Sequence, residues 1–117
     1  INLFAVFDNE DNVSNMTPNF DAVSKLDGQG LIISSSSNQY DFVSRYFCPK
    51  YGINEDPVTG SAHTTLIPYW SEKLNKISLT AKQVSKRGGE LFCENTENRV
   101  LIGGNAVLYM KGVIEID

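Results

Sequence analysis

The segment that most constrains the fold is an apolar stretch that follows a glycine-containing turn at residues 58–61. Apolar side chains recur in it at every fourth position, namely Ala62, Leu66, Trp70 and Leu74. This spacing predicts one face of a helix that begins near Thr59 or Ser61. Pro68 falls inside the helix, where a proline costs about 3 kcal/mol, so we expect a kink there or an end near Ile67. Because the other faces are largely apolar too, the sequence indicates a buried, central helix wrapped by sheet.

Strand-like segments flank this helix on both sides. Runs of β-branched and aromatic residues predict strands at 2–8, 30–37, 40–48 and 76–85, and about three more in "GELFCEN" and "RVLIGGNAVLYMKGVIEID". A short helix is predicted at 18–27, because Pro18 suits a first helical turn and Gly28 a helix end. The closely spaced strands at the end favour antiparallel pairing, so we expect an α+β fold.

Composition restricts the classes of function. The chain has 117 residues, enough for one domain with its own core. Its net charge is −4 and its largest basic cluster is "SKR" at 85–87, which argues against nucleic-acid binding. No apolar run reaches the roughly 18 residues that a membrane span needs. The first residues also lack the basic region and long apolar stretch of a signal peptide.

Cysteine usage points to a reducing compartment. Cys48 and Cys93 are too few and too far apart for a disulfide scaffold or a zinc site. We expect both to be buried, reduced thiols, which fits a cytoplasmic protein. The chain opens without Met and inside a predicted strand, so we expect it to be part of a longer protein.

The turn before the helix carries the residue types of an anion site. The first N–H groups of a helix have no partner within it, and the helix dipole places partial positive charge there. Gly60, Ser61 and Ala62 can therefore hold a carboxylate or phosphate through their amides, with the Ser61 hydroxyl as a further donor. Pro57 biases Asp56 to an extended conformation, so the Asp56 carboxylate can face the bound anion. A base that removes a proton next to a bound carboxylate needs this geometry.

An ordinary turn and helix cap explain the same residues. Thr59 or Ser61 would then cap the helix, a contribution of about 1 kcal/mol, and Asp56 would be a turn residue. Both interpretations fit the residue pattern.

Four further polar residues lie near this turn in sequence or in strand parity. His63, the only histidine, either packs or contacts ligand, and it has no ligand cluster beside it for a metal site. Continuing the parity of residues 77, 79 and 81 places Gln83, Ser85 and Arg87 on the core-facing side, where polar groups need partners. Either the strand leaves the core there, or these three side chains line a polar pocket.

Taken together, these segments resemble the PhzF-like proteins, which are named for a phenazine-biosynthesis isomerase and are related to diaminopimelate epimerase. The resemblance rests on four elements in the family's order and spacing: Arg45–Phe47, "EDPVTGSAH" at 55–63, "PYW" at 68–70 and "QVSKRGG" at 83–89. It covers most of the chain, best from about residue 40 to 112.

The resemblance implies a two-lobed protein, with an active site between the lobes. Each lobe would be an antiparallel, barrel-like sheet wrapped around a central helix. Residues 1–117 are similar to the C-terminal lobe alone, a single domain whose partner would be a missing N-terminal lobe. In such proteins the main acid/base glutamate and a second glycine-rich helix start come from the other lobe.

The resemblance also implies roles for the residues of the turn. Asp56 would be the acidic group that faces the ligand, and Gly60 and Ser61 would bind its carboxylate. The implied reaction is a cofactor-independent isomerisation, in which a proton moves at carbon on a small carboxylate-bearing metabolite. Neither Cys48 nor Cys93 lies in the motif, which disfavours a two-thiol racemase mechanism. The sequence contains no motif for a metal or a nucleotide.

Two alternatives stay open beside this reaction. A scaffold of this kind can bind a ligand or a partner without turnover, and the isolated chain would then be inactive. Two copies can also form a homodimer that mimics the two lobes, with two Asp56 side chains facing each other. The side chains that select the substrate would come from both lobes.

Overall fold

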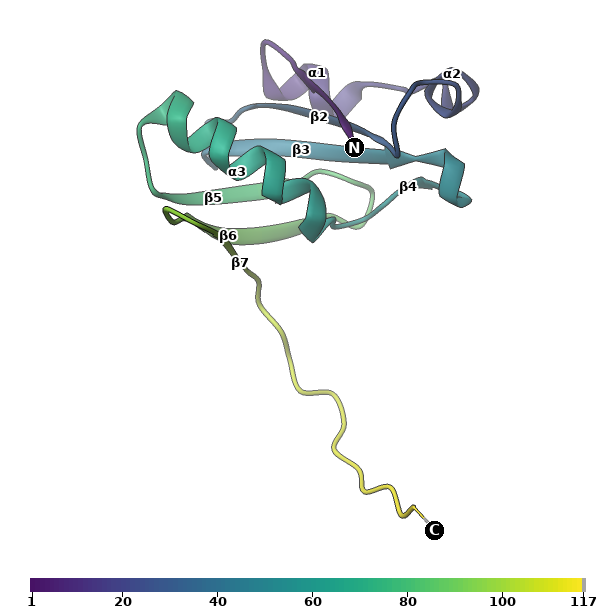
Figure 1. Ribbon diagram of the computed structural model, residues 1–117, viewed down its shortest axis with the longest axis vertical. Coiled ribbons are helices and arrows are strands. Elements are labelled where there is room, and N and C mark those ends of the chain that lie inside the picture. Colours follow the sequence, from purple (N-terminus) through teal and green to yellow (C-terminus); the bar gives the residue numbers. More distant parts are fainter. Residues whose placement is uncertain (117) are drawn as a thin grey trace.

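A computed structural model describes residues 1–116, which form a curved sheet with helices on both faces (Figure 1). In chain order the elements are β1 (Leu3–Val6), α1 (Glu10–Asn15), α2 (Phe20–Ser24), β2 (Leu31–Ser36), β3 (Phe42–Cys48), the 3₁₀ turn η1 (Pro49–Tyr51), β4 (Ile53–Glu55), α3 (Gly60–Leu74), β5 (Ser78–Gln83), β6 (Gly89–Asn95) and β7 (Val100–Gly103). We call residues 1–103 the body and residues 104–116 the tail.

The sheet is mixed and open. Its strands follow the order β1-β2-β3-β5-β6-β7, and β4 pairs with the end of β3. The predicted antiparallel pairing holds except for β1 with β2 and β3 with β5, which are parallel because helical crossovers connect them. The prediction of a barrel-like sheet wrapped around the helix is wrong for this chain, since β1 and β7 remain the edges. About eight strands close a barrel whose interior side chains alone fill, so this sheet is too small to enclose a whole helix.

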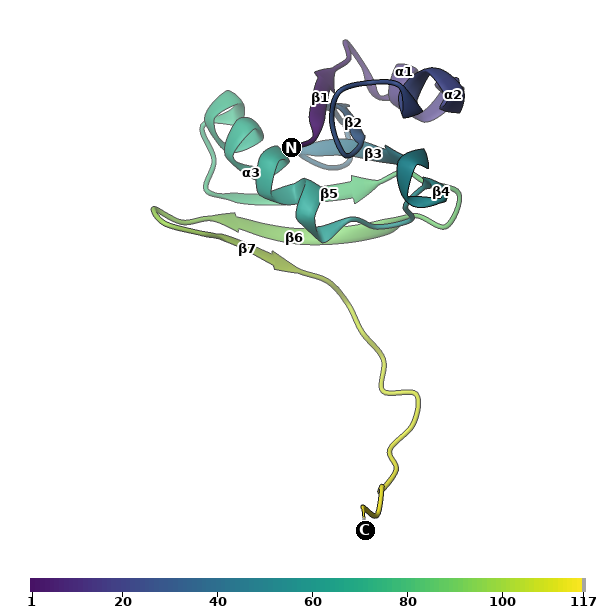
Figure 2. The same cartoon turned by 45° about the vertical axis from the view of Figure 1, so that its right-hand side comes forward.

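Each face of the sheet has its own core. On one face, α3 packs Leu66, Ile67 and Trp70 against the strands; on the other, Val13 of α1 and Val23 of α2 cover the sheet. Figure 2 shows α3 within the curve of the sheet, and α1 and α2 on its outside. Because successive side chains of a strand point to opposite faces of the sheet, the same strands contribute residues to both cores.

The central helix is continuous and buried along one side only. Residues 62, 63, 66, 67, 70 and 71 are buried, whereas residues 60, 61, 64, 65 and 68 are exposed. The helix does not end near Ile67 but runs without interruption from Gly60 to Leu74. Pro68 and Thr64, whose carbonyl loses its hydrogen bond, both face solvent, so water can satisfy that carbonyl. The helix ends at Asn75, which adopts a left-handed conformation with φ of 52°.

The tail differs from the sequence prediction. The run after β7 is predicted to continue as strands, but residues 104–116 contain neither helix nor strand. They run as an extended chain away from the body (Figure 1). β7, which directly precedes the tail, is the edge strand on this side of the sheet.

Candidate functional site

The site is built where β4 delivers the chain to the start of α3. Asp56 follows β4, and its N–H donates to the Tyr46 carbonyl of β3 at 3.1 Å. Glu55, one residue earlier, forms a two-pronged ion pair with Arg45 at 2.7 and 3.0 Å. The same guanidinium donates to the Met16 carbonyl, at 2.7 Å, so it also holds the chain after α1. The bidentate pair and the backbone bond fix the position of Asp56.

A buried glutamine organises the turn between Asp56 and the helix. Gln83 is fully buried on β5. Its Oε1 accepts from the Thr59 N–H at 2.7 Å, and its Nε2 donates to the Asp56 carbonyl at 2.7 Å and to Thr59 Oγ1 at 3.0 Å. These three bonds use both amide hydrogens and the carbonyl oxygen of Gln83. The Gln83 side chain thus holds the turn in place from the side of β5.

The Thr59 hydroxyl links Gln83 to the Asp56 carboxylate. It donates to Asp56 Oδ2 at 2.5 Å while it accepts from Gln83. A hydroxyl has one proton, so the Thr59 proton is committed to Oδ2. The carboxylate oxygen Oδ1 is therefore the one left for a ligand, and Asp56 is only half-buried.

Because of this arrangement, the start of α3 lacks an internal cap. Thr59 occupies the N-cap position, yet its side chain makes no capping hydrogen bond, and the first turn contains no acidic residue. The interpretation of Thr59 as an ordinary side-chain cap is therefore wrong, since its hydroxyl is turned to Asp56. Gly60 and Ser61 are exposed, and a Cβ built on Gly60 would meet only open space. The amides of this turn can thus receive an anion from outside the chain.

Two of the sequence-predicted site residues lie in the core. Ala62 and His63 are almost completely buried, so they face the sheet. His63 Nδ1 lies 2.8 Å from the Thr59 carbonyl, and a carbonyl only accepts, so Nδ1 carries the proton. Burial lowers the pKa of His63, and within residues 1–116 its Nε2 has no partner. The geometry fits a packing role for this ring better than direct ligand contact.

The loop after β5 borders the helix start. Ser85 Oγ donates to the Pro57 carbonyl at 2.7 Å and accepts from the Gly88 N–H at 3.0 Å, so it ties the loop to the turn. Arg87 is exposed. It lines a pocket of about 520 Å³ together with Gly60, and a second pocket of about 510 Å³ with Pro57. The segment 83–89 contains two basic residues, Lys86 and Arg87, and of these only Arg87 borders both pockets.

Other features of the described chain lie away from this turn. A pocket of about 610 Å³ borders β5, β6 and β7 and contains none of the predicted site residues. Cys48 and Cys93 are buried free thiols, and burial raises the pKa of Cys93 to about 11. Residues 1–116 contain no group of three side chains that could hold a metal ion. None of their helices is long and apolar enough to cross a membrane.

The structure brings Asp56 and Gln83 together around Thr59, which the sequence did not indicate as the partner of Asp56. Fold and site together define an α+β lobe in which an aspartate stands beside an uncapped helix start. The family described as "Phenazine biosynthesis-like protein" matches residues 1–112, and the chain belongs to this family.

Individual relatives agree with this assignment. An uncharacterized isomerase of Pseudomonas aeruginosa is 49% identical over 114 residues, which are 97% of this chain and 44% of that protein. The crystal structure of a PhzF-family protein from Enterococcus faecalis is 55% identical with a TM-score of 0.88, over 93% of this chain and 42% of that one. For a putative PhzC/PhzF protein from Clostridium difficile the identity is 50% and the TM-score 0.87, over 98% and 45%. The chain thus spans less than half the length of these relatives.

Proposed function

We propose that residues 1–117 are the C-terminal lobe of a two-lobed isomerase that moves a proton at carbon on a small carboxylate-bearing metabolite. One observation carries the proposal: Asp56 is held beside a helix start that has no side-chain cap and no acid of its own. The names of relatives as isomerases support the reaction class. Their length supports a second lobe, because this chain covers 42 to 45% of the relatives described above.

In this proposal the amides of Gly60 and Ser61 bind the substrate carboxylate, and the Ser61 hydroxyl adds a donor. The dipole of α3 and the exposed Arg87 favour the negative charge. Such a site lowers the energy of the carbanion or enolate that forms when a proton leaves the carbon next to the carboxylate. Gln83 and Ser85 do not contact the substrate in this proposal; their hydrogen bonds hold the turn and the loop in position.

Asp56 then assists the proton transfer through Oδ1, because Oδ2 is engaged by Thr59. The principal acid/base group would come from the other lobe. It would take the proton from one carbon, and the proton would return to another carbon of the same substrate, so that no redox partner and no cofactor enter the balance. A base must lie within about 3 Å of the proton that it removes, which the closing of the two lobes would provide.

The reaction can be tested with the full-length polypeptide in heavy water. We would incubate it with a panel of small unsaturated and amino carboxylic acids and follow C–H signals by proton NMR. Loss of one C–H signal with incorporation of deuterium is expected for at least one member. Asp56→Asn should slow this exchange by about 100-fold, the usual contribution of a positioned acid or base. An unchanged rate in Asp56→Asn would disprove the assigned role.

Anion binding can be tested separately with the 117-residue chain. Titration with acetate or succinate should shift the amide NMR signals of Gly60, Ser61 and Ala62 before those of the sheet. Arg87→Gln should weaken the binding and Lys25→Gln, a matched change of an exposed cation far along the chain, should not. Equal responses throughout the chain would contradict a carboxylate site at this turn. Binding without any exchange by the full-length polypeptide would instead support a non-catalytic scaffold.

A further inference from the structure

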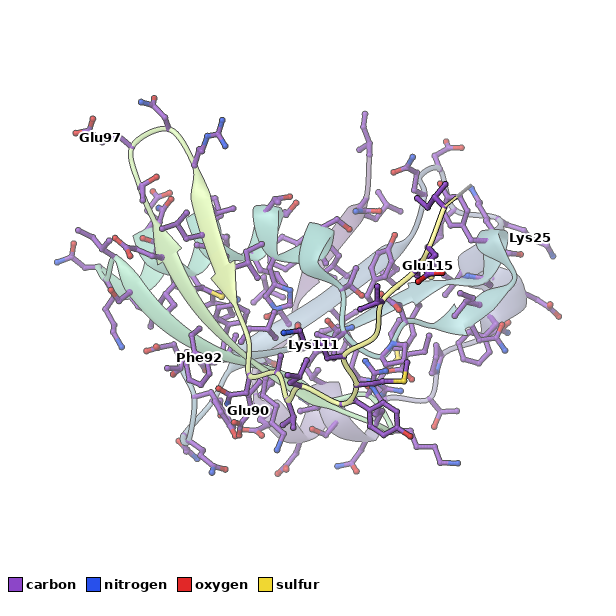
Figure 3. The ribbon with its side chains drawn as sticks, turned by 90° about the horizontal axis from the view of Figure 1, so that it is seen from below. Lys25, Glu90, Phe92, Glu97, Lys111 and Glu115 are labelled. Carbon is purple, nitrogen blue, oxygen red and sulfur yellow. The ribbon has the colours of Figure 1, made fainter. Side chains whose placement is uncertain are left out.

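His63 is a buried polar side chain for which the proposed reaction supplies no task. Exposed charged side chains such as Lys25 and Glu97 project from the periphery of the molecule (Figure 3), whereas the His63 ring is fully buried on α3. It packs beside the Phe42 ring of β3, with 5.9 Å between the ring centres. Within residues 1–116 its Nε2 has no hydrogen-bond partner, and such a group costs about 1–3 kcal/mol when buried. An apolar residue of similar size would fill this space without that cost, so packing alone does not account for an imidazole here.

The other nitrogen of the ring binds the residue that precedes the helix. Nδ1 lies 2.8 Å from the Thr59 carbonyl and donates its proton to it. The carbonyl of an N-cap residue also accepts the first backbone bond of the helix, and its two lone pairs accommodate both donors. Thr59 is this N-cap residue, and its own side chain makes no capping bond. The His63 ring therefore adds a tie between the first turn of α3 and the N-cap, which the Thr59 side chain does not supply.

With this bond, each polar group of Thr59 has a partner. Its N–H donates to Gln83 Oε1 at 2.7 Å, and its hydroxyl accepts from Gln83 Nε2 at 3.0 Å. The same hydroxyl donates to Asp56 Oδ2 at 2.5 Å, and the carbonyl accepts from His63. Gln83 belongs to β5 and His63 to α3, so both the sheet and the helix hold Thr59. The peptide groups on the two sides of Thr59 are thereby fixed, and with them the direction of its hydroxyl towards Asp56.

We propose that His63 is a positioning residue for Asp56 and acts through Thr59. The bond from Nδ1 holds the Thr59 carbonyl, the Thr59 hydroxyl keeps its bond to Asp56 Oδ2, and Oδ1 stays directed at the substrate. His63 itself touches no substrate in this arrangement, which agrees with its complete burial. This inference rests on the proposed function, in which Asp56 assists the proton transfer. A misplacement of about 1 Å in a reacting group can cost on the order of 100-fold in rate, so a residue that fixes Asp56 through Thr59 affects the rate without contacting the substrate.

The tautomer of His63 tests the first step without any substrate. His63 is the only histidine of the 117-residue chain, so labelling histidine with nitrogen-15 gives a single set of imidazole NMR signals. At neutral pH we expect an uncharged ring with its proton on Nδ1, the nitrogen that faces the Thr59 carbonyl. A proton on Nε2 instead would leave Nδ1 with no hydrogen to donate, and it would overturn the inference.

Two variants of the full-length polypeptide test the second step. His63→Asn places an amide N–H near the position of Nδ1, whereas His63→Leu fills the site with an apolar side chain and no donor. On the acid that the heavy-water panel identifies, we expect kcat for exchange to fall about 10-fold in His63→Leu with little change in KM. In His63→Asn it should stay within about 3-fold of the original value. Equal losses in the two variants, or an unchanged kcat in His63→Leu, would contradict the positioning role.

Thermal unfolding of the same variants separates positioning from stability. A buried amide has polar groups that need partners, so a purely structural role predicts that His63→Leu is at least as stable and as active as His63→Asn. The positioning role predicts the opposite order of activity. The two proposals also fail separately. An unchanged rate in Asp56→Asn disproves the proposed function, whereas a slow Asp56→Asn beside a fully active His63→Leu overturns only the role of His63.

Discussion

The start of α3 and the tail represent opposite extremes of one chain. At the helix start, Gln83, Thr59 and Asp56 satisfy one another in a buried cluster of hydrogen bonds. In the tail, side chains such as Val107 and Val113 lie almost entirely in water. The first region has completed its hydrogen bonds on the side of β5, whereas the large apolar side chains of the tail are at least 77% exposed. The contrast shows that the body completes the hydrogen bonds around Asp56 without any contribution from the tail.

The contrast depends most on Gln83, so its replacement should have the largest effect on stability. Gln83→Leu leaves the Thr59 N–H and the Asp56 carbonyl without their partner, and each buried unpaired group costs about 1–3 kcal/mol. We expect a loss of about 3 kcal/mol in the free energy of unfolding, measured by urea denaturation. The matched change Gln39→Leu is at an exposed position and should stay within about 0.5 kcal/mol. Similar values for both variants would refute the supporting role of Gln83.

Two glycines next to the site should behave differently. A Cβ on Gly89 would overlap the side chain of Val58, whereas a Cβ on Gly60 meets open space. Gly89→Ala should therefore lower the free energy of unfolding by about 1–3 kcal/mol through overpacking. Gly60→Ala should leave stability within about 0.5 kcal/mol yet weaken acetate binding, because its methyl group enters the anion's space. Thermal unfolding and NMR titration measure the two effects, and a destabilised Gly60→Ala would show that this glycine serves the fold.

The buried His63 predicts a pH dependence of smaller size. Burial lowers its pKa in the folded chain, so below about pH 6.5 the unfolded chain binds a proton that the folded chain does not. Stability should therefore fall as the pH decreases from 7 to 5.5, by at most about 1.4 kcal/mol per pH unit. His63 is the only histidine, so His63→Gln should flatten this slope. A slope that persists in the variant would assign the effect to other groups.

The sequence predicted the elements whose pattern lies in consecutive residues of the chain. The spacing of Leu66 and Trp70 located α3 correctly, and runs of β-branched and aromatic residues located β2, β3, β5 and β6 within about two residues. The family resemblance is confirmed. No element was predicted between residues 8 and 18, yet this segment contains α1, a helix of six residues capped by Asn9, which is too short for an apolar repeat to appear.

What the sequence missed are contacts between distant segments. Parity placed Gln83 on the core-facing side of its strand, but its hydrogen bonds to Asp56 and Thr59, 27 and 24 residues away, cannot be read from parity. Arg87 was placed on the same side, yet β5 ends at Gln83, so the loop carries Arg87 outward. The tail was read as strands because its residues favour a strand. Pairing into a sheet also depends on a neighbouring strand, which local pattern does not reveal.

The smallest effect should come from removing the tail from the isolated chain. A truncation after Asn105 removes side chains that are all exposed over residues 106–116, so the free energy of unfolding should change by less than about 0.5 kcal/mol. Urea denaturation of the chain with and without residues 106–117 gives the comparison. A clear loss of stability in the isolated chain would show that the tail folds back on the body, and it would remove the contrast between the two regions.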